Sequence, residues 1–147
     1  MNVTILMANK CSSTSVAATM EFFETANVLH HYVEKKSARN SLKGTKKSTP
    51  LFNVETASID GQAVLCTGGL TLTPDKLMTE VNETQLIIVP GFMFNILEVL
   101  PTLSSMTQWL QLQHSHGCHI ANMCTGSFVT AQAGLLDNRC ATTHWAF

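Results

Sequence analysis

Cys118-His-Ile-Ala-Asn-Met-Cys-Thr-Gly126 runs directly into Ser127-Phe-Val-Thr-Ala-Gln-Ala133, and this junction decides the fold. The residues from 118 to 123 predict a short strand, and those from 127 to 133 predict a helix that Gly134 caps. The three residues between them must then form a sharp strand-to-helix turn. A cysteine in such a turn, Cys124, lies at the amino end of a helix, where partial positive charge favours the thiolate.

A second strand is predicted at 85–89, where a proline and Gly91 terminate the unbroken apolar run Leu86-Ile-Ile-Val89. Such a run is typical of a parallel strand buried on both faces. Ligands of open α/β sheets bind at the carboxyl ends of the strands. The turn at Gly91 and Phe92 is therefore expected beside Cys124. The N–H of Thr125 and that of Gly91 or Phe92 would together receive an oxyanion.

The rest of the chain alternates between strand and helix patterns. Strands are predicted at 2–7, 51–58, 63–66, 69–73 and 139–143, and helices at 15–33, 74–81 and 96–113, the last restarting near Pro101. This alternation predicts an α/β fold with a parallel sheet that helices cover on both sides. Because the sequence stops at Phe147, where a new element should begin, we expect a domain that is incomplete at its C-terminal end.

The composition favours one domain with a large core and argues against DNA binding through net charge. The 147 residues are 45% hydrophobic and 13% charged, with a net charge of −1. A chain with this balance has no global basic field to hold a nucleic-acid backbone. Six of the nine Lys and Arg residues do cluster: Lys35, Lys36, Arg39, Lys43, Lys46 and Lys47. A solvated loop is the favoured interpretation, and contact with nucleic acid or an acidic partner is the alternative.

Cysteine usage points to a reducing, cytoplasmic compartment. The five cysteines are odd in number and irregularly spaced, which argues against a disulfide framework. No signal peptide is predicted, and no apolar stretch reaches the ~18 residues of a membrane span. The run His114-Ser-His116-Gly-Cys118-His119 lacks a second ligand pair, so neither a metal nor a cofactor is predicted. A lone cysteine is usually a small buried hydrophobe, which is the expectation for Cys11, Cys66, Cys118 and Cys140.

His144 is the expected partner of Cys124. It follows the predicted strand at 139–143, so it would lie on the same rim of the sheet. A neutral imidazole there would take the thiol proton, and the imidazolium would hold the thiolate.

Several stretches together resemble the ThiJ/PfpI branch of the class I glutamine amidotransferase-like superfamily. More narrowly, they resemble the N-terminal domain of AraC-type transcriptional regulators of the GlxA kind. The matching stretches are Ser15-Val-Ala-Ala-Thr-Met-Glu21-Phe, Ala26-Asn27, Gly68-Gly-Leu70, Pro74-Asp75, Leu86-Ile-Ile-Val-Pro-Gly91, Ile120-Ala-Asn-Met-Cys124-Thr-Gly-Ser-Phe128, Ala131-Gln-Ala-Gly-Leu-Leu-Asp137 and Ala141-Thr-Thr-His144-Trp145.

The resemblance implies a flavodoxin-like three-layer sandwich and a homodimer. It places the nucleophile-elbow cysteine at Cys124 and its histidine partner at His144. The ligand-binding set it suggests is Ser15, Gly91, Phe92, Cys124, Thr125 and His144. Hydrolytic relatives have an acidic residue where this chain has Ser15, and many relatives have a glycine where Phe92 would crowd the pocket.

Three functions stay open. The first is a ligand-sensing regulatory domain that binds a small metabolite near Cys124, with DNA contacted only through a C-terminal domain outside this sequence. The second is a cysteine-dependent amidase, protease or deglycase-like hydrolase, with Cys124 and His144 as catalytic residues. The third is a degenerate or truncated member without function of its own. The missing acidic partner favours the first over an enzyme.

Overall fold

The computed structural model describes residues 1–39 and 49–147. Lys43, Lys46 and Lys47 of the predicted basic loop lie outside the described residues. Within the described part, no helix is long and apolar enough to cross a membrane.

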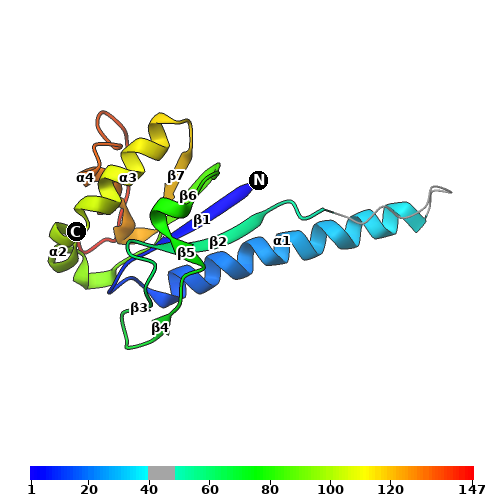
Figure 1. Ribbon diagram of the computed structural model, residues 1–147, viewed down its shortest axis with the longest axis horizontal. Coiled ribbons are helices and arrows are strands. Elements are labelled where there is room, and N and C mark those ends of the chain that lie inside the picture. Colours follow the sequence, from blue (N-terminus) through cyan, green and yellow to red (C-terminus); the bar gives the residue numbers. More distant parts are fainter. Residues whose placement is uncertain (40–48) are drawn as a thin grey trace.

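A five-stranded parallel sheet forms the centre of the molecule (Figure 1). Its spatial order is β5-β2-β1-β6-β7. The strands are β1 (Asn2–Met7), β2 (Asn53–Ser58), β5 (Lys76–Leu77), β6 (Leu86–Val89) and β7 (His119–Asn122). The chain builds outward from β1 in one direction and then returns to add β6 on its other side. The carboxyl ends of β1 and β6 therefore flank the point where strand order reverses, which is where open α/β sheets bind ligands.

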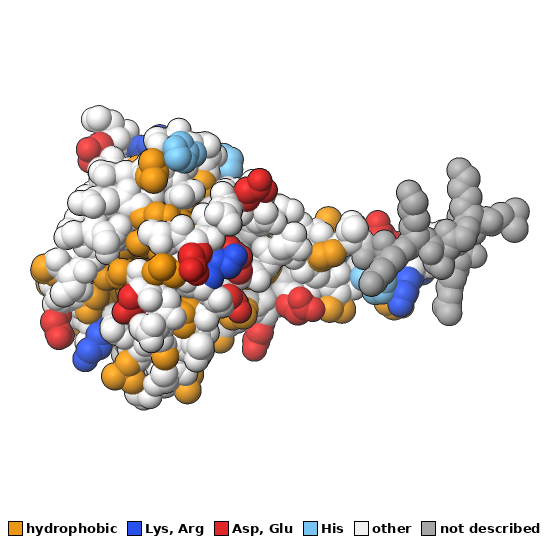
Figure 2. All heavy atoms as spheres, in the orientation of Figure 1, with side chains coloured by type: hydrophobic (Ala, Val, Ile, Leu, Met, Phe, Trp, Pro, Cys, Tyr) orange, Lys and Arg blue, Asp and Glu red, His pale blue; other side chains and the backbone are white. Residues whose placement is uncertain are grey.

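Helices cover both faces of the sheet, so the predicted flavodoxin-like α/β sandwich is confirmed. Helix α1 (Ser13–Arg39) lies on one side, and α2 (Ile96–Val99), α3 (Ser104–Ser115) and α4 (Ser127–Gln132) lie on the other (Figure 1). The second half of α1 extends beyond the sheet (Figure 1), and in the space-filling view it projects from the body of the molecule (Figure 2). Large apolar side chains are exposed along α1, namely Met20, Phe22, Val28, Leu29, Tyr32 and Val33.

Two predicted elements differ from the structure. The helix expected at 74–81 is instead β5 followed by a 3₁₀ turn at Met78–Glu80. The Asp75 carboxylate accepts hydrogen bonds from the Thr56 N–H and hydroxyl at 2.7 and 2.8 Å, which holds the chain extended beside β2. The strand expected at 139–143 does not form. Strands require a backbone ladder, and within the described chain this segment makes no backbone hydrogen bond to β7.

The other elements follow the prediction. The short strands predicted at 63–66 and 69–73 are present as β3 (Val64–Leu65) and β4 (Thr71–Leu72), which pair as an antiparallel hairpin. The predicted break near Pro101 is a 3₁₀ turn, Leu100–Thr102, between α2 and α3.

Asn27 joins α1 to the start of β2, and its removal should weaken the domain. Its amide donates to the Phe52 carbonyl at 2.8 Å and accepts from the Phe52 N–H at 2.9 Å. We expect Asn27→Ala to lower the free energy of unfolding by about 1–2 kcal/mol, because both partly buried Phe52 groups lose their partner. Urea denaturation measures this. Asn27→Asp should also be destabilised, because its carboxylate still accepts from the Phe52 N–H but has no hydrogen to donate to the Phe52 carbonyl. Parental stability of either variant would contradict the assignment.

Candidate functional site

Cys124 lies in a strained turn at the carboxyl end of β7. The 3₁₀ turn Cys124–Gly126 connects β7 to α4, and Cys124 has a φ of +50°. Residues other than glycine rarely adopt this left-handed region, and such strain is concentrated at functional sites. The side chain of Cys124 is exposed. The fold thus presents a thiol to solvent at the end of the sheet where a ligand is expected.

Close contact with the end of β6 makes this turn possible. A Cβ on Gly126 would lie 2.6 Å from the Pro90 carbonyl oxygen and 2.7 Å from that of Val89. Real Cβ atoms do not approach backbone this closely, so only glycine fits. The Met123 N–H also donates to the Val89 oxygen at 2.9 Å, which ties the two strand ends together.

Ser15, Gly91 and Cys124 converge beside this turn. A Cβ on Gly91 would lie 3.4 Å from the Cys124 Cβ and 3.5 Å from the Ser15 Oγ. Ser15 is in the first turn of α1, and the Ser12 N–H donates to the Gly91 carbonyl at 2.7 Å, which fixes that helix end against the β6 turn. Three predicted site residues from three different parts of the fold are therefore neighbours, and a side chain at residue 91 would contact both Ser15 and Cys124.

Two backbone N–H groups face no acceptor here. The Phe92 N–H is already used, because it donates to the Thr125 Oγ1 at 2.8 Å. In the described part of the chain, the N–H groups of Gly91 and Thr125 make no hydrogen bond. Of the two pairs considered from sequence, only Gly91 with Thr125 is free to receive a ligand oxygen.

The expectation that Phe92 crowds the pocket is wrong. Its side chain is 0% exposed and is one of the largest fully buried side chains of the core. Phe92 can therefore contribute to the site only through its backbone. Thr125 is likewise fully buried, and its hydroxyl holds the Phe92 turn in place.

His144 is partly buried in a small aromatic cluster. Its ring centroid lies 5.5 Å from that of Phe94, 5.3 Å from Trp145 and 6.2 Å from Phe147. The Ala146 N–H donates to His144 Nδ1 at 3.2 Å, so a neutral imidazole carries its hydrogen on Nε2. The imidazole in this state is a hydrogen-bond donor to anything that approaches Nε2.

The segment that carries His144 contacts the elbow through the neighbouring residue, Thr143. The hydroxyl of Thr143 donates to the Cys124 carbonyl at 3.2 Å, which brings residue 143 to the elbow. Across residues 1–39 and 49–147, no hydrogen bond joins the Cys124 thiol to the His144 imidazole or to a carboxylate. A cleft shared by Cys124 and His144 therefore stays a prediction.

Sequence analysis missed several residues around the elbow. Phe94 packs on His144, and the Ser127 hydroxyl donates to the Cys124 carbonyl at 3.0 Å. An apolar groove of about 170 Å³ lies behind this turn, lined by Ser127, Phe128, Ala131, Leu136, Ala141, Thr142 and Thr143. Phe94 was detectable as a second aromatic in the turn after β6. The groove was not, because its two walls are set by packing of the irregular C-terminal segment on α4.

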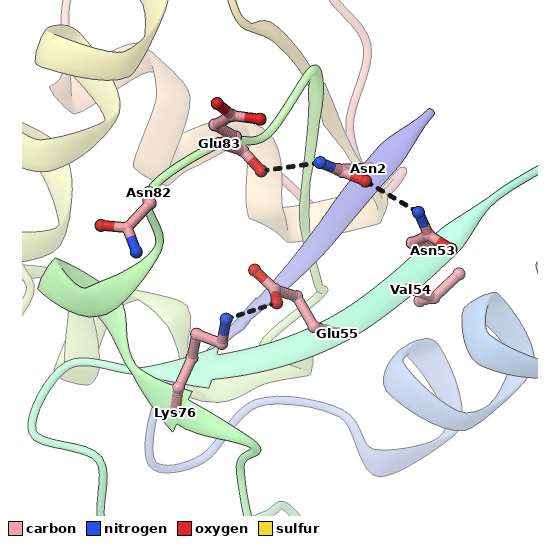
Figure 3. Close-up of a pocket in the computed structure, with 7 residues that line it drawn as sticks. All are labelled: Asn2, Asn53, Val54, Glu55, Lys76, Asn82 and Glu83. Carbon is pink, nitrogen blue, oxygen red and sulfur yellow. Dashed lines mark hydrogen bonds and ion pairs between the residues drawn. The ribbon is translucent and has the colours of Figure 1, made fainter.

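A more polar pocket lies at the opposite end of the sheet, beside the amino ends of β1 and β2 (Figure 3). It has a volume of about 220 Å³, and Asn2 and Asn53, which begin β1 and β2, are among its lining residues. Glu55 and Lys76 form an ion pair across it at 2.7 Å. Because Cys124 lies at the carboxyl ends of the strands, this pocket is separate from the cysteine site.

The remaining cysteines divide into buried and exposed. Cys11, Cys66 and Cys118 are buried, as predicted, but Cys140 is exposed. The prediction for Cys140 fails because its segment lies on the surface instead of pairing in the sheet. Among the described residues, no three His, Cys, Asp or Glu side chains are placed to hold a metal ion.

The elbow, the parallel sheet and the sequence motifs agree with a known family. The model of the DJ-1/PfpI family matches residues 1–147. The chain belongs to the DJ-1/PfpI family. Among curated proteins, this DJ-1/PfpI domain is similar to two HTH-type transcriptional regulators of Pseudomonas aeruginosa. It is 34% identical to CdhR over 65% of the chain and 33% identical to GbdR over 77%. These matches cover only 27% and 29% of the two regulators.

An enzyme and several solved structures are also similar to this DJ-1/PfpI domain. Isonitrile hydratase from Pseudomonas putida is 31% identical over 68% of the chain and 43% of the enzyme. A putative transcriptional regulator from Vibrio parahaemolyticus has a TM-score of 0.76 at 22% identity, covering 100% of this chain and 68% of the other. An AraC family transcriptional regulator from Pseudomonas putida has a TM-score of 0.72 at 24% identity, covering 99% and 67%. At these identities the structural likenesses establish the fold.

Proposed function

We propose that this DJ-1/PfpI domain is the ligand-sensing part of an AraC-type transcriptional regulator, binding a small metabolite beside Cys124. The observation that carries the proposal is the convergence of Ser15, Gly91 and the exposed Cys124 at one end of the sheet, together with two N–H groups, of Gly91 and Thr125, that make no hydrogen bond within the described residues. The similarity to HTH-type regulators supports the regulatory role.

The chemistry of the lining favours a ligand with a carboxylate or carbonyl oxygen. The N–H groups of Gly91 and Thr125 would donate to that oxygen, and the Ser15 hydroxyl would add a third polar contact. His144 would approach from the C-terminal segment, with its Nε2 hydrogen as donor. Phe92 would act through the backbone of its turn, because its side chain is buried.

DNA would be contacted by a separate domain of a cytoplasmic regulator. The net charge of −1 gives this domain no field to hold a phosphate backbone. The domain would act as a homodimer, for which the exposed apolar side chains of α1, such as Phe22 and Leu29, offer a surface. Ligand binding would then alter DNA affinity by favouring one arrangement of the two copies.

A cysteine hydrolase is the second candidate, and the strained, exposed Cys124 is the observation that favours it. Cys124 would attack a carbonyl carbon, and the Gly91 and Thr125 N–H groups would stabilise the oxyanion. The hydrogen bond from Ala146 to Nδ1 argues against this candidate, because it leaves Nε2 of a neutral His144 protonated and unable to accept the thiol proton.

Binding measurements on matched cysteine variants test the proposal. We expect a panel of small carboxylates and amides, screened by thermal shift, to contain a compound that stabilises the parent domain. Titration calorimetry of that compound should show affinity reduced about tenfold or more, ~1.4 kcal/mol, by Cys124→Ala. Gly91→Ala should have a similar effect, because the added methyl group enters the space between Ser15 and Cys124.

Cys140→Ser is the control, because Cys140 is also exposed but does not belong to the elbow. It should bind with parental affinity. Equal binding by the Cys124 and Cys140 variants would place the ligand elsewhere and overturn the proposal. Consumption of the compound by the parent, abolished in Cys124→Ser, would instead establish the hydrolase.

A further inference from the structure

Two buried cysteines that are distant in sequence meet near the start of α1. Cys11 lies in the turn between β1 and α1, and Cys66 directly follows β3. Their Sγ atoms are 3.8 Å apart, although 55 positions separate them in the chain. Cys11 is 0% exposed and Cys66 is 2% exposed. Figure 1 shows the β3–β4 hairpin beside the first turns of α1.

The backbone holds these two residues together. The Thr67 N–H donates to the Cys11 carbonyl at 2.9 Å, and the Lys10 N–H donates to the Leu65 carbonyl at 2.8 Å. The Thr67 hydroxyl also donates to the Lys10 carbonyl at 2.7 Å. Each cysteine is therefore flanked by hydrogen bonds to the neighbours of the other, so the short sulfur separation is imposed by the main chain.

We propose that Cys11 and Cys66 form a disulfide when hydrogen peroxide oxidises them, covalently joining the start of α1 to the β3–β4 hairpin. The Cys66 thiolate attacks one peroxide oxygen, the O–O bond breaks, and water leaves as a sulfenic acid forms. The Cys11 sulfur then attacks the Cys66 sulfur, the S–O bond breaks and a second water leaves. Two thiols lose two electrons and two protons, and one hydrogen peroxide becomes two waters.

The order of attack follows from the environments of the two sulfurs. Burial raises the pKa of Cys11 to about 12, so Cys11 has less thiolate and is the less reactive of the two toward peroxide. Burial also raises the pKa of Cys66, but the hydrogen bond from Cys11 opposes that rise. Cys66 is carried by a hairpin whose strands have two residues each. Such small units open locally at low free-energy cost, which admits a molecule of peroxide size.

This inference concerns a site apart from the elbow and does not depend on the proposed ligand. Cys118 is also buried, and its thiol donates to the His119 carbonyl. Within the described residues, its sulfur makes no hydrogen bond to another sulfur. It therefore serves as an internal control for accessibility and unfolding.

The test uses the full chain carrying Cys124→Ser and Cys140→Ser, which removes the two exposed thiols. After hydrogen peroxide treatment and thiol blocking, trypsin digestion without reductant should release residues 11–35 linked to residues 48–76. The linked species should be two hydrogens lighter than the sum of the two peptides and should disappear with dithiothreitol. The melting temperature should rise, because the cross-link restricts the unfolded chain.

Three results would overturn the proposal. The first is the absence of the linked peptide after peroxide treatment while circular dichroism stays native. The second is oxidation of Cys118 as fast as cross-linking, which would show that unfolding exposes every cysteine. The third is loss of Cys11 thiol at the parental rate in a folded Cys66→Ser variant, where the proposal expects Cys11 to stay reduced.

Discussion

Gly126→Ala is expected to destabilise the domain by about 3 kcal/mol, at the upper end for an overpacked site. The added methyl group would lie 2.6 and 2.7 Å from the carbonyl oxygens of Pro90 and Val89. Those atoms belong to the backbone at the end of a buried strand, so neither can move without disturbing the sheet. The elbow would have to shift away from β6. Urea denaturation of the purified variant, followed by circular dichroism, measures the loss.

Gly91→Ala is the matched control for this prediction. Its methyl group would make ordinary contacts of 3.4 to 3.5 Å with Cys124, Met123 and Ser15. We expect its stability to fall by less than about 1 kcal/mol, although its ligand affinity should drop. If the two alanine variants were equally stable, the close approach of the elbow to β6 would be disproved.

Phe92→Ala should lower stability by about 3–5 kcal/mol, the usual range for a large aromatic side chain removed from a core. The ring of Phe92 is 0% exposed, so its loss leaves a cavity beneath the turn that follows β6. The Phe92 N–H also donates a hydrogen bond to the Thr125 hydroxyl, so collapse around the cavity should displace the elbow. Thermal and urea unfolding should both report the loss.

Phe94→Ala provides the contrast, because its ring is two residues away but 67% exposed. It packs on His144 instead of the core. We expect a change in stability within about 0.5 kcal/mol, together with greater mobility of the His144 ring in NMR spectra. A Phe94 variant as unstable as the Phe92 variant would contradict the assignment of the two rings.

The site combines strain with unused hydrogen-bonding capacity. Cys124 is held at a φ of +50° because Gly126 locks the following turn against β6. Thr125 and Gly91 lie on the two turns that this contact brings together, and neither N–H makes a hydrogen bond within the described residues. Such an arrangement suits a site that recognises an oxygen atom, whether the consequence is a change in DNA affinity or nucleophilic attack.

Sequence alone determined the fold class and the elbow. Short apolar runs identified β1 and β6, and apolar residues at helical spacing identified α1, because buried parallel strands and helices each require a characteristic pattern of apolar residues. The Cys124-Thr-Gly126 turn was predictable because the strand predicted at 118–123 and the helix predicted at 127–133 are separated by only these three residues. The burial of Cys11, Cys66 and Cys118 followed from the usual preference of cysteine for the interior.

Tertiary structure decided which way the neighbouring side chains point. Nothing local distinguishes Phe92 from Phe94, and only packing against the sheet buries the first and leaves the second on His144. The segment around Cys140 has a strand-like composition, yet a strand exists only where a neighbour completes its hydrogen bonds. The Cys11–Cys66 contact was likewise beyond sequence analysis, because it depends on where the β3–β4 hairpin docks after a separation of 55 residues.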